Sequence, residues 1–364
     1  MIGLATDGDV RRAILAGHSM EDSVKVCMRS DFIYAHQESA EDERFKLLNE
    51  KIRHLPVLDE GGRPVDMESW AEIWQVPIVR PYLGGNELKY VTECIRSNWI
   101  SSQGPFVKQF ETQFASFHGR KYGLCTSSGT TALHLALLGL GIGEGDEVIV
   151  PNLTFGASAN AILHAGATPV LADCDPHHWT IDVEKIEKLI SPKTKAIMPV
   201  HLYGHSCDMD AIQSIANGHN LYVVEDCAES LGARYKGCLS GTHGDVACFS
   251  FFGNKMITTG EGGMVLVDDA EIFDRMQVMR DHGMRPSRRY WHEYAGYNYR
   301  MTNVQAAIGC AQFEQLDTFL EARIAMARTY DERLAGNKCL TLPPREAWNS
   351  PSFWLYGVLV NTTE

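Results

Sequence analysis

Apolar residues gather in short, nearly continuous runs through the middle of the chain, and helical or polar stretches separate these runs. Runs of about four to eight residues bounded by turn residues are typical of strands buried on both faces. We expect five such strands, at residues 148–151, 169–173, 196–201, 221–226 and 246–250. Helical spacing lies between them, for example at 157–164 and 208–217. This alternation predicts an α/β fold in which helices flank a mostly parallel sheet on both faces.

The same kind of pattern extends on both sides of this region. Before it, we expect two helices, a strand and a third helix, at 88–98, 106–118, 122–126 and 127–138. After it, we expect a strand at 264–268, a helix that follows Asp269 and a polar loop at 284–291. A long helix then runs through Gln312 towards Leu334, and a final strand covers 352–360.

Residues 1–76 form a separate unit in this interpretation. Thr6 is placed to cap a helix, helical spacing recurs at 41–51, and a short strand begins at His54. The next domain of the chain begins at Pro77.

Composition narrows the class of protein. The chain has 364 residues and a formal net charge of −13, which argues against a nucleic-acid or anionic-membrane partner, because both call for basic patches. No apolar run is long enough to span a bilayer, so we expect no membrane association. The ten cysteines include no C-x-x-C pair, which indicates a reducing, cytoplasmic compartment and no metal site.

A single lysine stands out at the end of the strand 246–250. The apolar run is followed by a turn at Gly253 and Asn254, and Lys255 comes directly after this turn. A glycine-rich stretch then leads into the strand at 264–268. A lysine held in such a frame is partly desolvated, which lowers its pKa and supplies the neutral amine that a Schiff base requires. A surface lysine after a strand is the ordinary alternative.

Two further features complete a constellation. Small residues from Ser127 to Thr131 open a helix whose first N–H groups can bind phosphate, although an ordinary Ser/Thr cap is the alternative. Asp226 follows a buried strand, where it either caps a turn or faces a ligand at the sheet edge. A phosphate site, an acid and a lysine are the protein groups that pyridoxal 5'-phosphate requires.

Six motifs in order strengthen this interpretation, and they occupy residues 128–137, 151–155, 199–204, 225–233, 249–255 and 296–302. On these motifs the chain from residue 77 onward resembles the fold type I sugar aminotransferases of the DegT/DnrJ/StrS family, and within that family the GDP-perosamine synthases. The resemblance implies the fold type I large domain of PLP-dependent transferases.

The resemblance also implies roles for residues around the cofactor ring. Lys255 would carry the cofactor as a Schiff base and move the proton of the substrate carbon. Asp226 would pair with the pyridine nitrogen, and Glu229 would lie near the ring hydroxyl. Phe155 would stack on the ring.

Four more residues are expected around the cofactor phosphate. Gly129, Thr130 and Ser250 would bind it within one subunit. Asn298 would reach the phosphate of the neighbouring subunit, so the resemblance implies a homodimer with its active sites at the interface.

The implied reaction transfers an amino group from L-glutamate to a nucleotide-linked 4-keto-6-deoxy sugar, for polysaccharide or O-antigen biosynthesis. Alternatives are 3-amination or dehydration on the same fold, or a non-catalytic nucleotide-binding protein with a regulatory or assembly role. The dehydratases of the family have histidine in place of the lysine, so Lys255 favours amination.

The same comparison suggests a domain plan. Residues 1–76 resemble part of a cystathionine-β-synthase (CBS) module, since Thr6-Asp-Gly-Asp9 matches a CBS helix start whose Thr and Asp contact nucleotides. Residues 77–320 would form the PLP-binding large domain. Residues 321–364 would begin a C-terminal subdomain that is incomplete in this sequence.

Overall fold

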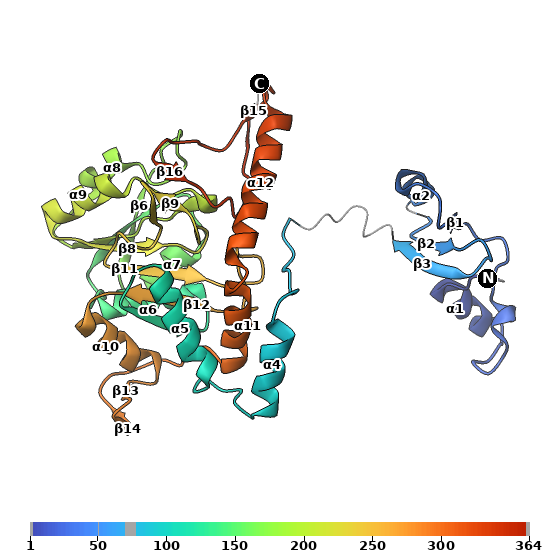
Figure 1. The fold of residues 1–364 in the computed structure, drawn as a ribbon, viewed down its shortest axis with the longest axis horizontal. Helices are drawn as coiled ribbons and strands as arrows, with labels where there is room; N and C mark the ends of the chain where they lie inside the picture. Colours follow the sequence, from blue (N-terminus) through green and yellow to red (C-terminus); the bar gives the residue numbers. More distant parts are fainter. Residues whose placement is uncertain (1–2, 50, 70–77, 362–364) are drawn as a thin grey trace. The chain divides into compact units, whose positions relative to one another are not determined.

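The computed structural model of the protein describes residues 3–49, 51–69 and 78–361. The chain falls into two compact units, Met1–Val79 and Arg80–Glu364 (Figure 1). Each unit has a hydrophobic core of its own. The predicted domain boundary between residues 76 and 77 lies outside the described residues.

The smaller unit holds a three-stranded sheet together with helices. In chain order, its described elements are α1 (Asp7–Leu15), a 3₁₀ turn (Val24–Val26), β1 (Ala35–His36), α2 (Glu41–Leu47), β2 (His54–Leu58) and β3 (Pro64–Ser69). β1 is parallel to β2, and β2 is antiparallel to β3. The helix predicted over 41–51 ends earlier, because Leu48 takes an extended conformation and buries its side chain with Ala35 and Leu55.

The larger unit is built on a seven-stranded sheet with the order β4-β12-β11-β8-β7-β5-β6. Its strands are β4 (Tyr122–Thr126), β5 (Glu147–Pro151), β6 (Thr168–Ala172), β7 (Thr194–Ile197), β8 (Tyr222–Asp226), β11 (Val246–Ser250) and β12 (Gly263–Val267). β12 runs antiparallel to both of its neighbours, while β11, β8, β7, β5 and β6 pair in parallel. The predicted α/β fold with a mostly parallel sheet is confirmed.

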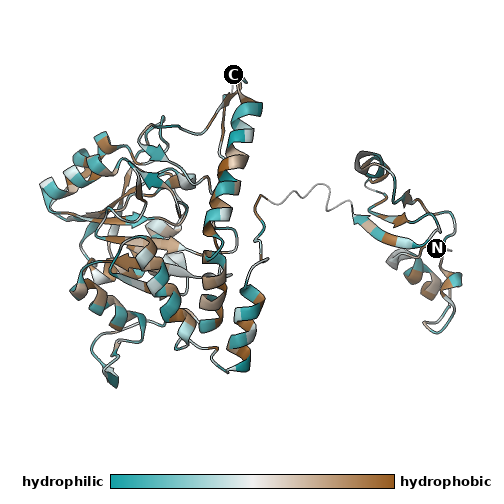
Figure 2. Ribbon diagram, in the orientation of Figure 1, coloured by the Kyte–Doolittle hydropathy of each residue, from teal (hydrophilic) through white to brown (hydrophobic). Residues whose placement is uncertain are grey.

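Helices cover both faces of this sheet. One face packs against α6 (Gly129–Gly139), α7 (Ala157–His164) and α10 (Ala270–Arg280), and the other against α5 (Pro105–Phe117), α8 (Val183–Leu189), α9 (Met209–His219) and α11 (Asn303–Phe313). Side chains alternate between the two cores along each strand. In β11, Val246 and Cys248 lie on the α6 side, whereas Ala247 and Phe249 lie on the α5 side. Figure 2 shows this apolar centre in brown, with hydrophilic residues on the outer helix faces.

The remaining described elements lie around the sheet. They are α4 (Glu87–Arg96), a 3₁₀ turn (Leu202–Gly204), β9 (Arg234–Tyr235), β10 (Cys238–Leu239), β13 (Met284–Arg285), β14 (Arg288–His292), α12 (Leu316–Leu334), β15 (Leu340–Thr341), β16 (Asn349–Ser350) and β17 (Leu359–Val360). None of the described helices combines the length and the apolar character that crossing a membrane requires.

The predicted long helix towards Leu334 is in fact two helices. α11 ends at Phe313 and α12 begins at Leu316. The break lies beside the buried carboxylate of Glu87, which belongs to α4. The side-chain amides of Gln312 and Gln315 both donate to Oε1 of Glu87, over 2.6 and 3.0 Å. The hydrophobic pattern continues through the break and does not reveal it.

Two predicted strands are shorter than expected. The strand predicted over 196–201 is β7, and it stops before Pro199, which has no N–H group for the next ladder bond. The strand predicted over 352–360 is wrong for most of its length, since β17 covers its last two residues before Asn361. Phe353 has a φ of 50°, which no strand allows, and the segment around it is buried without regular structure.

The predicted polar loop at 284–291 is a β-hairpin instead. β13 and β14 pair antiparallel, and the hairpin projects beyond α10 (Figure 1). The side chain of Arg285 ties the hairpin to α10 through an ion pair to Asp274 at 2.8 Å, and it also pairs with Glu293, just after β14, at 2.6 Å. Because β14 is exposed on both sides, its sequence has no apolar alternation that would indicate a strand.

Candidate active site

A cavity of about 360 Å³ opens where β8, β11 and the start of α6 meet at one edge of the sheet. Seven of the eight residues predicted from the sequence line this cavity, namely Gly129, Thr130, Phe155, Asp226, Glu229, Ser250 and Lys255. The remaining one, Asn298, does not line it. In parallel α/β sheets ligands bind beyond the carboxyl ends of the strands, and this cavity lies at such an edge.

The Lys255 side chain enters the cavity from the turn that follows β11. Its backbone N–H donates to the carbonyl of Phe252 at 2.9 Å, which fixes the turn. The side chain is 13% exposed, and its Nζ lies 3.7 Å from Oε1 of Glu229. Burial lowers the pKa of Lys255, although the charges of Glu229 and Asp226 oppose this effect. The amine is therefore closer to its neutral, nucleophilic form than a surface lysine.

Asp226 ends β8 and offers a buried carboxylate to the cavity. Its Oδ2 accepts from the Ser158 hydroxyl at 2.8 Å, and its Oδ1 accepts from the Ala228 N–H at 3.1 Å. Burial raises the pKa of Asp226, with the Ser158 hydrogen bond acting in the opposite direction. A cationic ring nitrogen placed against this carboxylate would favour its ionised form. Sequence reasoning missed Ser158, whose hydroxyl also lies 2.8 Å from that of Thr154.

The start of α6 forms a close cradle beside Ser250. Ser128 caps the helix through reciprocal hydrogen bonds with Thr131. Gly129 and Thr130 are the first residues of the helix, so their N–H groups have no carbonyl four residues earlier within it and are open to an anion. A Cβ on Gly129 would lie 2.7 Å from Cβ of Ser250, which shows how closely the helix approaches β11 here. A phosphate-bearing pyridine with an aldehyde fits this cradle, carboxylate and lysine.

Gly129→Ala should weaken cofactor binding. The added methyl group would collide with Ser250 and push the helix start away from the strand, which displaces the N–H donors. We expect the dissociation constant for pyridoxal phosphate to rise by about tenfold or more, the equivalent of roughly 1.4 kcal/mol. Fluorescence titration of the cofactor-free protein measures this constant. Gly218→Ala is the control, because a Cβ at this helical position meets nothing within 4 Å, and it should bind normally.

Asp226→Asn should reduce turnover while preserving the fold. The asparagine keeps the side-chain size and can still accept a hydrogen bond from Ser158 or Ala228, but it provides no charge for the ring nitrogen. We expect kcat to fall by about 10²- to 10³-fold, in the range seen when one electrostatic group is removed from an active site. Single-turnover kinetics measures the effect. The exposed Asp210→Asn is the control, and equal rates in both variants would contradict the assigned role.

Glu229 and Phe155 lie at different depths in the cavity. Glu229 is buried and accepts from the Tyr203 N–H at 2.9 Å, and burial raises its pKa. Phe155 is 76% exposed, so its ring is a free apolar surface beside the cavity. The stacking role of Phe155 and the hydroxyl contact of Glu229 stay predictions.

Asn298 lies on the surface beside α10. Its Oδ1 accepts from Arg300 at 3.1 Å, and Arg300 also pairs with Asp281 at 2.9 Å. Asn298 is thus oriented by its own chain while its side chain stays exposed. Its expected contact with a neighbouring subunit stays a prediction.

Behind the cavity, a fully buried pair supports the end of β8. His201 Nε2 lies 3.0 Å from Oε2 of Glu225, and His201 Nδ1 accepts from the Cys207 N–H, so the ring proton sits on Nε2. Glu225 also accepts backbone N–H groups from the loop at 241–244. Of the described residues, His201, Glu225 and Cys227 have the spacing of a metal group. However, these N–H donors already occupy both Glu225 oxygens, which makes the group a structural network.

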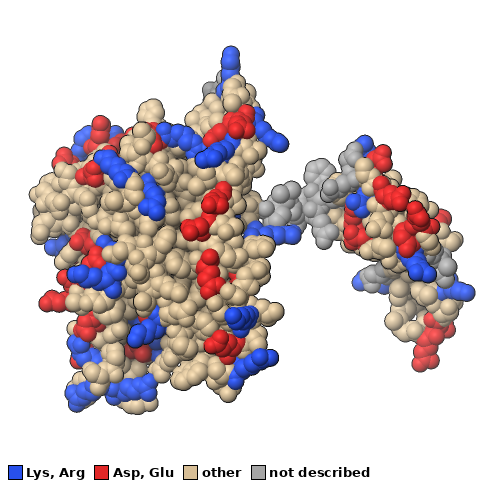
Figure 3. Space-filling model, viewed as in Figure 1, with Lys and Arg blue, Asp and Glu red and all other residues tan. Residues whose placement is uncertain are grey.

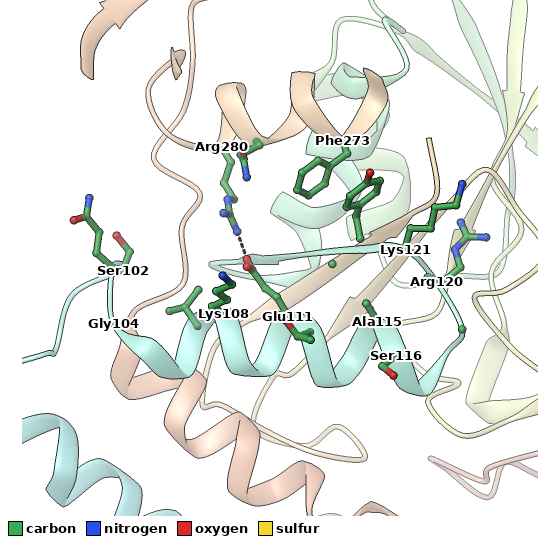
Figure 4. Close-up of a pocket in the computed structure, with 17 residues that line it drawn as sticks. Ser102, Gly104, Lys108, Glu111, Ala115, Ser116, Arg120, Lys121, Phe273 and Arg280 are labelled. Atoms are coloured by element: carbon green, nitrogen blue, oxygen red, sulfur yellow. Dashed lines mark hydrogen bonds and ion pairs between the residues drawn. The ribbon is translucent and has the colours of Figure 1, made fainter. Parts of the chain in front are cut away.

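A second, larger hollow of about 730 Å³ runs along α5, the start of β4 and α10 (Figure 4). Figure 4 shows the guanidinium of Arg280 reaching Glu111, and this ion pair measures 2.6 Å. Arg120, at the other end of the hollow, pairs with Asp268 at 3.3 Å. These charges neutralise one another, and the hollow does not include Lys255 or Asp226. Figure 3 likewise shows acidic and basic groups intermingled on the face in view.

Comparison with known proteins agrees with this geometry. Residues 81–364 match the model of the DegT/DnrJ/EryC1/StrS aminotransferase family. GDP-perosamine synthase from Caulobacter vibrioides is 52% identical over 79% of this chain and 78% of its own, and that from Escherichia coli O157:H7 is 48% identical over 79% of each. The crystal structure of DesV from S. venezuelae with a ketimine intermediate superimposes with a TM-score of 0.73 at 38% identity, covering 76% of this chain and 74% of DesV. The chain therefore belongs to the DegT/DnrJ/EryC1/StrS family of pyridoxal-phosphate-dependent aminotransferases.

Proposed function

We propose that the protein transfers the amino group of L-glutamate to C4 of a nucleotide-linked 4-keto-6-deoxy sugar, as a GDP-perosamine synthase does. The high identity to the GDP-perosamine synthases supports this substrate class. The observation that carries the proposal is the convergence of Lys255, Asp226 and the α6 start on one cavity. We place the reaction in the cytoplasm, in the biosynthesis of surface polysaccharide such as O-antigen.

The chain's own residues divide the work of such a transfer. Bound pyridoxal phosphate supplies the electron sink for the substrate carbon. The α6 start would bind the phosphate, and Asp226 would hold the ring nitrogen in its charged form. Lys255, with its lowered pKa, takes a proton from the substrate carbon and returns it, while Glu229 stands within 3.7 Å to stabilise the ammonium form.

Product analysis tests the proposal directly. The purified protein is incubated with L-glutamate and, in separate reactions, with GDP- and UDP-linked 4-keto-6-deoxy sugars. We expect a 4-amino sugar from the GDP-linked substrate and one equivalent of 2-oxoglutarate. Amination at C3 or loss of water from the sugar would support the alternative reactions instead. No turnover by a protein loaded with cofactor would support a non-catalytic role.

We further propose that the active unit is a homodimer in which Asn298 serves the neighbouring site. Its exposed position supports this. Lys255→Ala and Asn298→Ala, each inactive alone, should regain activity when the subunits are mixed and exchanged, because one site per heterodimer then keeps both residues. Without any recovery, an Asn298 contact across the interface is excluded.

For residues 1–76 we propose a CBS-like docking or regulatory module, ahead of a large domain at 77–320 and a C-terminal subdomain that starts at 321. Thr6 and Asp9 are engaged within this module. The Thr6 N–H donates to Asp9 at 3.0 Å, and Arg29 donates to the same carboxylate at 3.2 Å. These contacts leave Asp9 little capacity for a ribose. We therefore expect no nucleotide-induced rise in thermal stability, which differential scanning fluorimetry with AMP and ATP measures.

A further inference from the structure

The indole of Trp354 lies against the catalytic lysine. Nζ of Lys255 is 3.7 Å from the centre of the Trp354 ring. The indole Nε1–H donates to the carbonyl of Asn254 at 2.7 Å, so the same side chain also holds the residue that precedes the lysine. Trp354 is 6% exposed and lies outside the six motifs that support the family resemblance.

Two groups therefore face the amine of Lys255 at the same distance. The ring of Trp354 lies at 3.7 Å, and so does the carboxylate of Glu229. Asp226 also acts on the amine through its charge. An aromatic face attracts an ammonium group, most strongly when the pair is shielded from water. Burial alone would favour the neutral amine, whereas the ring and the carboxylates favour the ammonium form.

The backbone behind these two groups is strained. Phe353, next to Trp354, has a φ of 50°, and Tyr203, whose N–H holds Glu229, has a φ of 54°. Bulky residues rarely adopt this left-handed region, and such strain persists where the surrounding structure imposes it. The two strained residues are joined through Gly204, whose carbonyl accepts from the Ser352 N–H at 3.0 Å. A Cβ on Gly204 would lie only 2.6 Å from the Phe353 nitrogen.

The segment that carries Trp354 is also fixed to α12. The guanidinium of Arg345 lies 4.1 Å from the centre of the Phe353 ring, and Arg345 pairs with Asp331. The Tyr356 hydroxyl donates to Asp331 at 2.7 Å. Contacts on both sides of Trp354 thus hold its ring in place over the lysine.

We propose that Trp354 is a positioning residue for Lys255, whose indole face holds the ammonium group beside Glu229 and keeps the amine directed into the cavity. The inference requires the reactive lysine of the family but is independent of the sugar and the nucleotide. A failed search for the sugar substrate would therefore leave it standing.

The first test measures the pH dependence of Lys255 reactivity in the cofactor-free protein. The rate of acetylation of Lys255 by acetic anhydride, read by peptide mass spectrometry, is followed against pH in the wild type and in Trp354→Phe and Trp354→Leu. We expect the midpoint to fall in the order Trp, Phe, Leu, with the leucine variant lower by about 0.5 to 1 pH unit. The surface variant Trp291→Leu, which removes an indole that stacks on Arg288, should leave the midpoint unchanged.

An unchanged or higher midpoint in a folded Trp354→Leu protein would overturn the proposal. Circular dichroism establishes whether the variant folds. If the leucine variant does not fold, a second measurement tests the proposal without that variant. The wild type is labelled with 5-fluorotryptophan, and the Trp354 ¹⁹F resonance is assigned by its loss in Trp354→Phe. This resonance should titrate at the Lys255 midpoint and should stop doing so in Lys255→Met; a resonance that ignores this range of pH excludes the contact.

Discussion

Lys255→Ala should lack the visible absorbance of the wild-type protein with pyridoxal phosphate and should lose transamination by at least about 10²- to 10⁴-fold, the usual contribution of a positioned acid–base group. The amine of Lys255 is the only lysine nitrogen among the described residues that lines the cavity. No other lysine in the described ranges is therefore placed to form the Schiff base there or to move the substrate proton. Borohydride should bleach the wild-type band and fix the cofactor to the peptide that contains residue 255.

The fold should survive this substitution. Lys255 contributes one ion pair to Glu229 at 3.7 Å, and Glu229, whose pKa burial already raises, can become neutral when its partner is lost. Lys185→Ala on the exposed side of α8 is the matched control and should retain colour and turnover. A coloured, active Lys255→Ala protein would remove the basis of the active-site assignment.

Glu225→Gln should destabilise the larger unit by about 3 to 5 kcal/mol, the cost of breaking a buried charged network from one side. Glu225 is fully buried, and its oxygens accept from His201 and from the N–H groups of Gly241, His243 and Gly244 at 2.6 to 3.0 Å. A glutamine amide would turn its own N–H groups towards at least one of these donors. Urea unfolding followed by fluorescence measures the loss, and the exposed Glu187→Gln should be neutral.

The same carboxylate predicts a pH dependence. Burial would raise the pKa of Glu225, but its hydrogen bonds to His201 and to the Gly244 N–H lower it to about 2. Because the pKa of Glu225 is lower in the folded state than in the unfolded chain, where it is near 4.5, the ionised carboxylate stabilises the fold above pH 4.5. This stabilisation is lost as the pH falls from 4.5 towards 2. Acid unfolding of the wild type should therefore be steeper between these values than that of Glu225→Gln. Parallel acid profiles would argue against this role of the carboxylate.

The sequence predicted the sheet and most of the site because both depend on local patterns. Buried parallel strands appear as apolar runs, and Asp226 and Ser250 fall at their ends. The glycine and hydroxyl residues from Ser128 to Thr131 mark the start of α6 and can be recognised from the local sequence. Lys255 follows from its position after β11 and the return strand β12.

The contacts that sequence reasoning missed come from distant segments. Ser158 reaches Asp226 from α7, and Trp354 reaches Lys255 from a stretch that was predicted to be a strand. The apolar content of 352–360 gave no indication of the left-handed turn at Phe353, because its backbone torsion is imposed by packing against Gly204. Tertiary contacts override local propensity at these positions.

The position of β12 has a consequence for synthesis of the chain. β4 pairs only with β12 within the described sheet, so Thr126 has no strand beside it until Gly263 has been made. At about 5–20 residues per second, a nascent chain exposes this unpaired edge on the ribosome for on the order of ten seconds. During that interval the unpaired N–H and C=O groups of β4 form an edge that can pair with other chains.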